Sequence, residues 1–392
     1  MRILLASPAY WPARAFGGPV VVARELVRRL VDRGYEIDVL TTTIQDQQSR
    51  PSGHTSVATV DGARVYALGT PLHYRWMGIT PTLPWWLTRL PRADLAHVYG
   101  FRDPVTTLTA HWCRVRGIPY VFEPLGMLRP RLRKVGLKRA LDATVYRGIA
   151  TGAAVVACVS NIEAADATAA GVPAERIAIR GNGFPDPGEM PTAIDLRAQL
   201  GIAATGRIVL YVGRIAAGKG IEHLLEATRR DDTVHLVLAG PDDRHGTMKL
   251  VDAARSAPAT AGRVHVLPPT PEPPLPLYGA ADVFVLASAG DSFGMVAAEA
   301  AAAGAPVVVT DTCGIAGFFR EGEALVVPDR RDAVVGAIGA VLSDDSLRRR
   351  LAAGGVAAAR RMSWDQVTDV QERIYRAAAS RTAWTNDSTD GS

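Results

Sequence analysis

The sequence contains little cysteine and no long apolar run. Its three cysteines, Cys113, Cys158 and Cys313, stand far apart among 392 residues. An odd and scattered set argues against a disulfide framework, and we expect a protein of the reducing cytoplasm. No metal-ligand cluster accompanies these cysteines, no apolar run reaches membrane-spanning length, and the apolar start of the chain is too short for a signal peptide.

The remaining composition describes a globular protein of two domains. Apolar residues make up 48% of the chain and charged residues 21%, which is typical of a soluble protein. A chain of 392 residues exceeds the size that one hydrophobic core usually serves. The formal net charge of +5 is modest. It favours an anionic substrate or an anionic membrane surface and does not require nucleic acid.

Strands and helices alternate through the first half of the chain. Residues 2–7 predict a strand, a loop with Gly17 and Gly18 follows, and a helix begins at Pro19. This order is typical of the first unit of a doubly wound sheet. Two glycines before a helix can form a cradle for an anion, or they can be there only for the backbone conformation that the turn needs. Further strands are predicted at 37–40, 63–68, 94–99, 119–123 and 153–160.

A second series of the same kind follows a linker. Residues 160–163 have the pattern of a capping box, and proline and glycine cluster at 184–191, where we place the linker. A last helix is expected at 364–379, and the polar tail 380–392 is expected to be disordered. The pattern therefore predicts two successive α/β domains. Strands of the second series are predicted at 207–212, 234–239, 264–267, 282–287, 305–310 and 324–327.

Two acids flank a predicted loop-helix junction within 286–310, LASAGDSFGMVAAEAAAAGAPVVVT. Asp291 lies in the loop, and Glu299 lies about one turn inside a helix that starts at Met295. A helix start leaves backbone N–H groups free at its positive end, here those of Phe293, Gly294 and Met295. Two carboxylates with donors between them suit a polyol joined to a phosphate. The alternative is that Asp291 or Ser292 only caps the helix and Glu299 is a solvated surface residue.

Cations follow the first strand of the second series. Arg214 and Lys219 lie between a strand and a helix, where α/β sheets bind phosphates. Residues 213–219 also satisfy most of a Walker A pattern. The next residue is Gly220, so the hydroxyl that would hold magnesium is missing.

In the order and spacing of these motifs the chain resembles the family 4 retaining glycosyltransferases. The resemblance runs from the Gly17-Gly18 loop to the Trp364 helix. It implies an α/β GT-B fold, in which two Rossmann-like domains face each other across a cleft that closes on the donor. The N-terminal, acceptor-binding domain is then 1–185, joined by the helix 364–379, and the nucleotide-sugar domain is 186–363.

The resemblance also implies roles for single residues. Arg214 and Lys219 grip the diphosphate, Glu299 holds the ribose hydroxyls, and Asp291 meets the donor sugar together with the amides at the helix start. The glycines at 17 and 18 join the donor site from the first domain. Asp stands at 291 where Glu is commoner in the family, which leaves the identity of the sugar open.

The resemblance implies a reaction without a metal or other cofactor. Transferases that hold a metal through Asp-x-Asp need that triplet, and the sequence contains none, so Arg214 and Lys219 must neutralise the departing diphosphate. A nucleophilic carboxylate for double displacement is not evident. The family is instead described as reacting on one face of the sugar, where the departing phosphate takes the proton of the acceptor hydroxyl.

The acceptor side is less defined. Several relatives have a His where this chain has Leu125, and Glu123 and His111 are weak acceptor-side candidates for which a structural role is the favoured alternative. The basic segment 129–147 can contact anionic lipid on the inner face of a membrane, or it can be a solvated helix face.

We therefore predict a cytoplasmic enzyme of polysaccharide or glycoconjugate biosynthesis. It would transfer a hexose-type sugar from a UDP- or GDP-sugar to a glycan, glycolipid or small-molecule acceptor. A P-loop-like NTPase and a non-catalytic sugar-nucleotide-binding protein are the alternatives.

Overall fold

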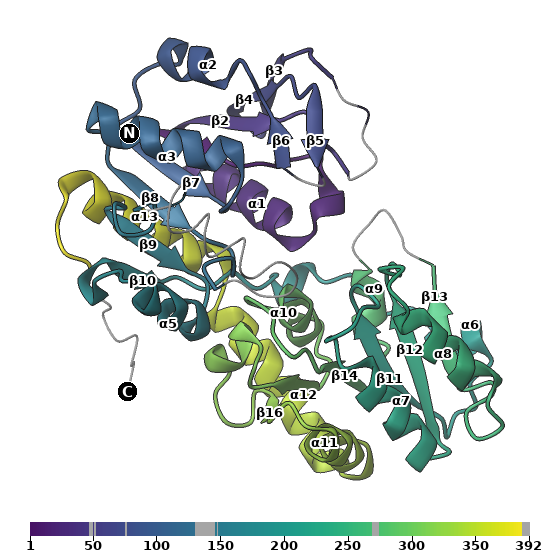
Figure 1. The fold of residues 1–392 in the computed structure, drawn as a ribbon. Helices are drawn as coiled ribbons and strands as arrows, with labels where there is room; N and C mark the ends of the chain where they lie inside the picture. Colours follow the sequence, from purple (N-terminus) through teal and green to yellow (C-terminus); the bar gives the residue numbers. More distant parts are fainter. Residues whose placement is uncertain are drawn as a thin grey trace. The chain divides into compact units, whose positions relative to one another are not determined.

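The chain forms two compact α/β units. The structure is a computed structural model and describes residues 1–46, 50, 52–74, 77–129, 146, 148–268 and 274–385. Unit 1 is Met1–Gly181 together with the residues from Trp364 onward, and unit 2 is Asn182–Ser363. The boundary thus falls a few residues before the expected one at 185, and the last helix groups with the N-terminal unit (Figure 1).

Unit 1 is built on a sheet in the order β10-β9-β8-β7-β1-β2-β4-β3. Neighbouring strands are parallel except β3, which runs antiparallel to β4 at the edge. The strands are β1 (Arg2–Ala6), β2 (Glu36–Thr42), β3 (Ser56–Val60), β4 (Ala63–Leu68), β7 (Leu95–Tyr99), β8 (Tyr120–Glu123), β9 (Val155–Cys158) and β10 (Ile177–Ile179). A separate antiparallel pair, β5 (Leu72–Tyr74) and β6 (Met77–Ile79), was not predicted.

Helices of unit 1 begin and end at residues that suit those positions. The helix after β1 begins at Gly18, one residue before Pro19, with Gly17 as its N-cap. Asp103 caps another by accepting from the Thr106 N–H at 2.9 Å. The helices are α1 (Gly18–Asp32), α2 (Leu83–Arg89), α3 (Pro104–Arg116), α5 (Asn161–Ala169) and α13 (Trp364–Ser380), with short 3-10 turns η1 (Arg14–Phe16) and η2 (Ala174–Arg176).

The capping box at the start of α5 is only half formed. The Ser160 side chain accepts from the Glu163 N–H at 3.3 Å, as predicted. The Glu163 carboxylate does not return to Ser160; it is buried and accepts from the Val159 N–H at 2.7 Å and from the Gly126 N–H. Glu163 therefore ties α5 to the loop after β8.

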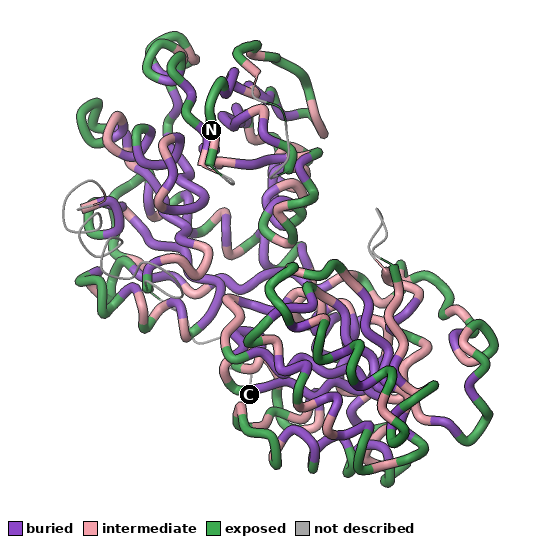
Figure 2. The backbone as a smooth tube through the Cα atoms, turned by 45° about the vertical axis from the view of Figure 1, so that its right-hand side comes forward, coloured by how far each residue is buried: buried purple, intermediate pink, exposed green. Residues whose placement is uncertain are grey.

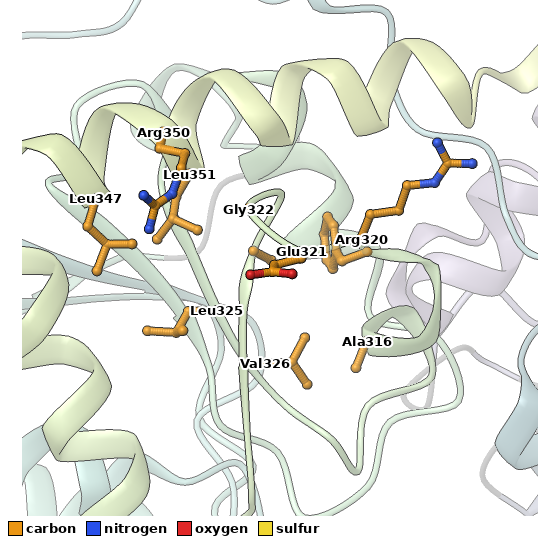
Figure 3. Close-up of a pocket in the computed structure, with 11 residues that line it drawn as sticks. Ala316, Arg320, Glu321, Gly322, Leu325, Val326, Leu347, Arg350 and Leu351 are labelled. Carbon is orange, nitrogen blue, oxygen red and sulfur yellow. The ribbon is translucent and has the colours of Figure 1, made fainter. Parts of the chain in front are cut away.

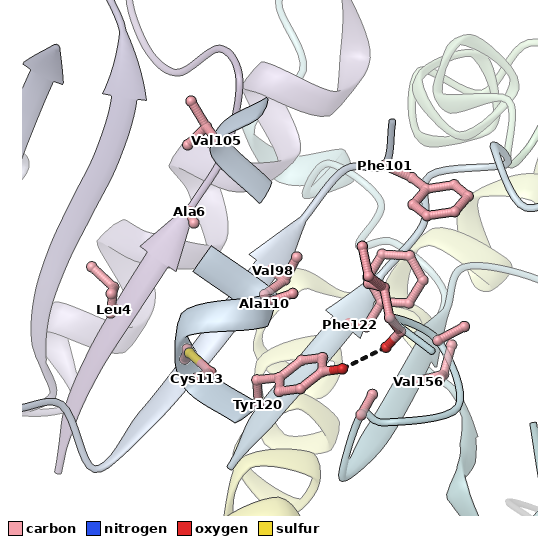
Figure 4. Packing of buried hydrophobic residues seen from close by; sticks show 14 of the residues in the cluster. Leu4, Ala6, Val98, Phe101, Val105, Ala110, Cys113, Tyr120, Phe122 and Val156 are labelled. Carbon is pink, nitrogen blue, oxygen red and sulfur yellow. Dashed lines mark hydrogen bonds between the residues drawn. The ribbon is translucent and has the colours of Figure 1, made fainter. Parts of the chain in front are cut away.

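Both faces of the unit 1 sheet are buried, which explains its continuous apolar strands. Val98 and Phe122 point to the face covered by α2, α3 and α5, where the Tyr120 hydroxyl donates to the Ile149 carbonyl at 2.6 Å (Figure 4). Leu95 and Val121 point to the opposite face, under α1 and α13.

Unit 2 is built on an all-parallel sheet in the order β13-β12-β11-β14-β15-β16. Its strands are β11 (Arg207–Val212), β12 (Val234–Ala239), β13 (Val264–Leu267), β14 (Val283–Leu286), β15 (Val307–Thr310) and β16 (Leu325–Val327). Its helices are α6 (Leu196–Leu200), α7 (Ile221–Arg230), α8 (Thr247–Ser256), α9 (Leu275–Tyr278), α10 (Met295–Ala302), α11 (Arg331–Ser343) and α12 (Asp345–Arg361), with η3 (Pro187–Glu189) and η4 (Gly314–Phe318).

The strand order of unit 2 marks a place for a ligand. The chain builds the sheet outward from β11 to β13 and then returns to add β14 to β16 on the other side. The loops after β11 and β14 therefore leave the carboxyl edge in opposite directions, and ligands of open α/β sheets bind at such a switch point. Figure 2 shows buried residues gathered in the interior of each unit and exposed residues around them. No described helix combines the length and apolar character needed to cross a bilayer.

Candidate functional site

The loops after β11 and β14 are held against each other at the carboxyl edge of the unit 2 sheet. The Ala289 N–H donates to the Gly218 carbonyl at 2.9 Å. A Cβ at Gly220 would lie 2.0 Å from the Ala287 carbonyl oxygen, and this glycine has a φ of 67°. Glycine is required there by both the close approach and the left-handed backbone. The contact fixes the position of Lys219, the residue before Gly220.

Lys219 and Asp291 are brought together by these loops. The Lys219 Nζ donates to Asp291 Oδ2 at 2.8 Å and to Ser288 Oγ at 3.3 Å. The side chains of the pair are 27% and 25% exposed. The Asp291 backbone is anchored to the start of η4, the turn that follows β15, since its carbonyl accepts from the Gly314 N–H at 3.0 Å. A phosphate or a sugar hydroxyl can therefore reach the pair without unfolding the loop.

Free donors lie at the start of α10. The helix begins at Met295 with Gly294 as its N-cap, and no side chain caps it. Within the part of the chain that the structure describes, the N–H groups of Phe293, Gly294 and Met295 have no hydrogen-bond acceptor. The interpretation of Asp291 or Ser292 as a helix cap is therefore wrong. These N–H groups remain available to an anion, at the positive end of the helix.

Glu299 lies on the open side of α10. On the helix, Met295, Val296 and Glu299 are half-buried, whereas Ala297, Ala298 and the alanines at 300–302 are buried. Residues four apart share one side of a helix. Burial raises the pKa of Glu299 to about 7, although the Tyr278 hydroxyl opposes this rise by donating to Oε2 at 2.5 Å. Glu299 is therefore not a solvated surface residue, and no pattern in the sequence pointed to Tyr278 as its partner.

Arg214 follows β11 directly. The Tyr211 hydroxyl donates to its backbone carbonyl at 2.8 Å, while the side chain is exposed. Its guanidinium forms no hydrogen bond or ion pair with the residues that the structure describes. The backbone of this loop is thus held in place, while the Arg214 guanidinium is free to bind a ligand.

The remaining predicted site residues belong to unit 1. Gly17 has a φ of 82° and open space where a Cβ would be, and Gly18 is the first residue of α1. His111 is half-buried on α3, two turns from the helix start. Its acceptor-side role stays a prediction.

Glu123 is a correction to the sequence-based list. Its side chain is fully buried and accepts two bonds from Arg180, both at 2.8 Å. His97 Nε2 lies 3.2 Å from the same carboxylate, and Arg180 also donates to Gln371 Oε1 of α13 at 2.7 Å. Burial raises the pKa of Glu123, but Arg180 and His97 outweigh it and the pKa is lowered. With both oxygens engaged and no exposed atom, Glu123 is structural.

A hollow of about 500 Å³ lies elsewhere in unit 2, beside β16 and α12. Leu325, Leu347 and Leu351 contribute to its lining, and the Arg320 side chain points away from it (Figure 3). None of the predicted donor-site residues lines it. The basic segment 129–147 lies almost wholly outside the described residues.

Two family models match the chain in succession. Residues 17–183 match the glycosyl transferase 4-like domain, and residues 193–356 match the glycosyl transferases group 1. Together they span most of both units.

Relatives of known sequence agree with these models. The chain is 34% identical over 202 residues to a D-inositol 3-phosphate glycosyltransferase of Xylanimonas cellulosilytica, covering 50% of this chain and 48% of the relative. It is 36% identical over 199 residues to the protein of the same name from Thermomonospora curvata, covering 46% and 45%. The chain thus spans about half the length of these curated relatives. An uncharacterised glycosyltransferase of Methanocaldococcus jannaschii is 24% identical over 399 residues, covering 96% of this chain and 98% of that protein.

Solved structures of the same fold cover nearly the whole chain. Sucrose-phosphate synthase from Thermosynechococcus elongatus superposes with a TM-score of 0.76 at 21% identity, covering 97% of this chain and 100% of that one. Anabaena HepE in complex with UDP-glucose superposes with a TM-score of 0.73 at 20% identity, covering 97% and 100%. At such identities the likeness establishes the fold. The chain belongs to the family 4 glycosyltransferases, and its two Rossmann-like units are those of the GT-B fold.

Proposed function

We propose that the protein is a retaining glycosyltransferase that moves a hexose-type sugar from a UDP- or GDP-sugar to an acceptor hydroxyl without a metal ion. The observation that carries the proposal is the meeting of Lys219, Asp291 and the free amides of α10 at the switch point of unit 2. Anabaena HepE, a protein of the same fold, has been crystallised with UDP and with UDP-glucose.

Each part of the donor has a matching group in unit 2. The ribose hydroxyls lie at Glu299, the diphosphate between Arg214 and Lys219, and the sugar hydroxyls at Asp291 and the α10 amides. Lys219 must then turn partly from Asp291 towards the phosphate. Both side chains are about one quarter exposed, and an ion pair that water reaches contributes only about 0–1 kcal/mol, so this exchange costs little.

The two cations would act on the leaving group. Breaking the bond to the anomeric carbon leaves negative charge on the nucleoside diphosphate, and fixed cations stabilise that charge as it develops. The acceptor hydroxyl loses its proton to the departing phosphate oxygen and bonds the anomeric carbon from the same face. The acceptor is a glycan, a glycolipid or a small molecule.

The NTPase alternative is disfavoured by the loop itself. A P-loop needs Ser or Thr after its Lys to hold magnesium. Position 220 accepts no side chain, because a Cβ would overlap the Ala287 carbonyl.

A panel of UDP-, GDP- and dTDP-sugars tests the proposal. We expect one donor to stabilise the protein thermally, to be hydrolysed slowly without acceptor, and to transfer its sugar with the anomeric configuration kept, all in excess EDTA. Arg214→Gln is the matched variant, with hydrolysis lowered and folding unchanged. Loss of activity in EDTA with recovery in magnesium would refute the metal-free reaction. Binding without hydrolysis or transfer would favour a non-catalytic sugar-nucleotide-binding protein.

A further inference from the structure

Tyr278 connects the core of unit 2 to the acid at the open side of α10. It is the last residue of α9, is fully buried, and packs its ring edge-on against Phe284 of β14 at 5.5 Å. Its hydroxyl donates to Glu299 Oε2 at 2.5 Å. The phenol is thus fixed at its ring end and meets the carboxylate at the other end.

This bond leaves the second oxygen of the carboxylate open. A glutamate side chain has several rotatable bonds and loses entropy when it is held in one orientation. A bond from a rigid phenol restricts that freedom before any ligand arrives. In the described part of the chain, Glu299 Oε1 has no hydrogen-bond partner. The arrangement leaves one oxygen free on the side of α10 that also carries Met295.

Among the residues that the structure describes, no cation forms an ion pair with Glu299. Among the described groups, burial and the Tyr278 hydroxyl alone set its protonation, and the Lys219 ammonium pairs with Asp291 instead. The phenol is therefore the group that favours the ionised carboxylate.

We propose that Tyr278 is a positioning residue for the donor, whose hydroxyl orients Glu299 so that the free oxygen accepts from the ribose hydroxyls and selects ribonucleotides. The inference rests on the proposed function, because Glu299 must lie at the ribose. A carboxylate held for two neighbouring hydroxyls loses an interaction when one of them is absent, so 2′-deoxy nucleotides bind more weakly.

The test compares UDP and GDP with their 2′-deoxy counterparts by calorimetry between pH 5.5 and 8.5. The variants are Tyr278→Phe, Glu299→Gln and their double variant. Tyr120→Phe is the control, since it removes a buried tyrosine hydroxyl in unit 1. The diphosphate of UDP and GDP also titrates in this pH range. The association constant of each protein at each pH is therefore divided by that of Glu299→Gln at the same pH.

For Tyr278→Phe we expect about three- to tenfold weaker binding at pH 7 and a smaller preference for the ribonucleotide. The midpoint of the affinity-versus-pH profile should move to higher pH, because the phenol no longer favours the ionised Glu299 carboxylate. The double variant should bind no more weakly than Glu299→Gln, and Tyr120→Phe should bind as the wild type. If Tyr278→Phe leaves affinity, preference and midpoint unchanged while Glu299→Gln weakens binding, the positioning role is refuted and the proposed function stands. If Glu299→Gln also binds as the wild type, the placement of the donor fails.

Discussion

The two units each hold an acid paired with a base near the carboxyl ends of their strands, but in different surroundings. In unit 1 the Glu123–Arg180 pair is at most 1% exposed, has two bonds of 2.8 Å and contacts His97 and Gln371. In unit 2 the Lys219–Asp291 pair is about one quarter exposed. The first pair fastens α13 to the sheet, and the second is open to exchange for a ligand. Both pairs join an acidic and a basic side chain near the carboxyl ends of strands, so the difference between them is burial.

The largest effect is expected from a substitution that breaks the buried Glu123–Arg180 pair. Glu123→Gln should lower the free energy of unfolding of unit 1 by about 3–5 kcal/mol, because it leaves the Arg180 guanidinium buried without its counter-charge. All seven tryptophans lie in unit 1, so their fluorescence in a urea titration reports this unit alone. Unchanged unfolding together with lost transfer would return Glu123 to the acceptor site.

The next effect concerns the donor. Glu299→Gln should weaken nucleotide affinity by about 1.5–3 kcal/mol, because a ribose-bound carboxylate loses a charge-assisted hydrogen bond. The same change removes a charge that is costly to bury, so the unliganded protein should be no less stable at pH 8. Calorimetry with UDP and GDP measures the affinity, and an unchanged value would remove Glu299 from the site.

The architecture was predictable because both sheets bury two faces. Such strands appear as continuous apolar runs, and the bounds of β4, β11, β12 and β13 agree with the prediction. The pair β5–β6 and the edge strand β3 were missed, since β3 is largely exposed and lacks an apolar run. The short helix α2 was missed as well.

The site was predictable where its residues are close in the sequence, as in 286–310. Long-range partners were not. Tyr278 lies 21 residues before Glu299 and Arg180 lies 57 after Glu123, and no pattern links them. A buried acid and an accessible one look alike in a sequence, which is why Glu123 remained a weak acceptor-side candidate beside its structural alternative.

A third expectation uses pH to sharpen the contrast. The pKa of Glu299 is raised to about 7 by burial, so much of this carboxyl is protonated at pH 6 and ionised at pH 8. If the donor binds the ionised form, affinity for the nucleotide sugar should rise about tenfold between these values. Because the folded pKa exceeds the unfolded one, stability that Glu299 contributes is present at low pH and declines as pH rises through 7. Glu299→Gln should flatten both profiles, and a wild-type affinity that falls with pH would contradict this account.

The smallest expected effect is on folding when the open pair of unit 2 is broken. Lys219→Gln should change the free energy of unfolding of unit 2 by less than about 1 kcal/mol, because water reaches the Asp291 side chain, which is one quarter exposed, and can solvate its carboxylate once its partner is gone. Unit 2 contains no tryptophan, so its unfolding is followed by circular dichroism in urea, with the tryptophan signal as an internal reference for unit 1. Donor hydrolysis should fall in the same variant, because the departing diphosphate loses a cation. A loss of stability as large as that of Glu123→Gln would make Lys219–Asp291 a second structural pair and remove the distinction between the two units.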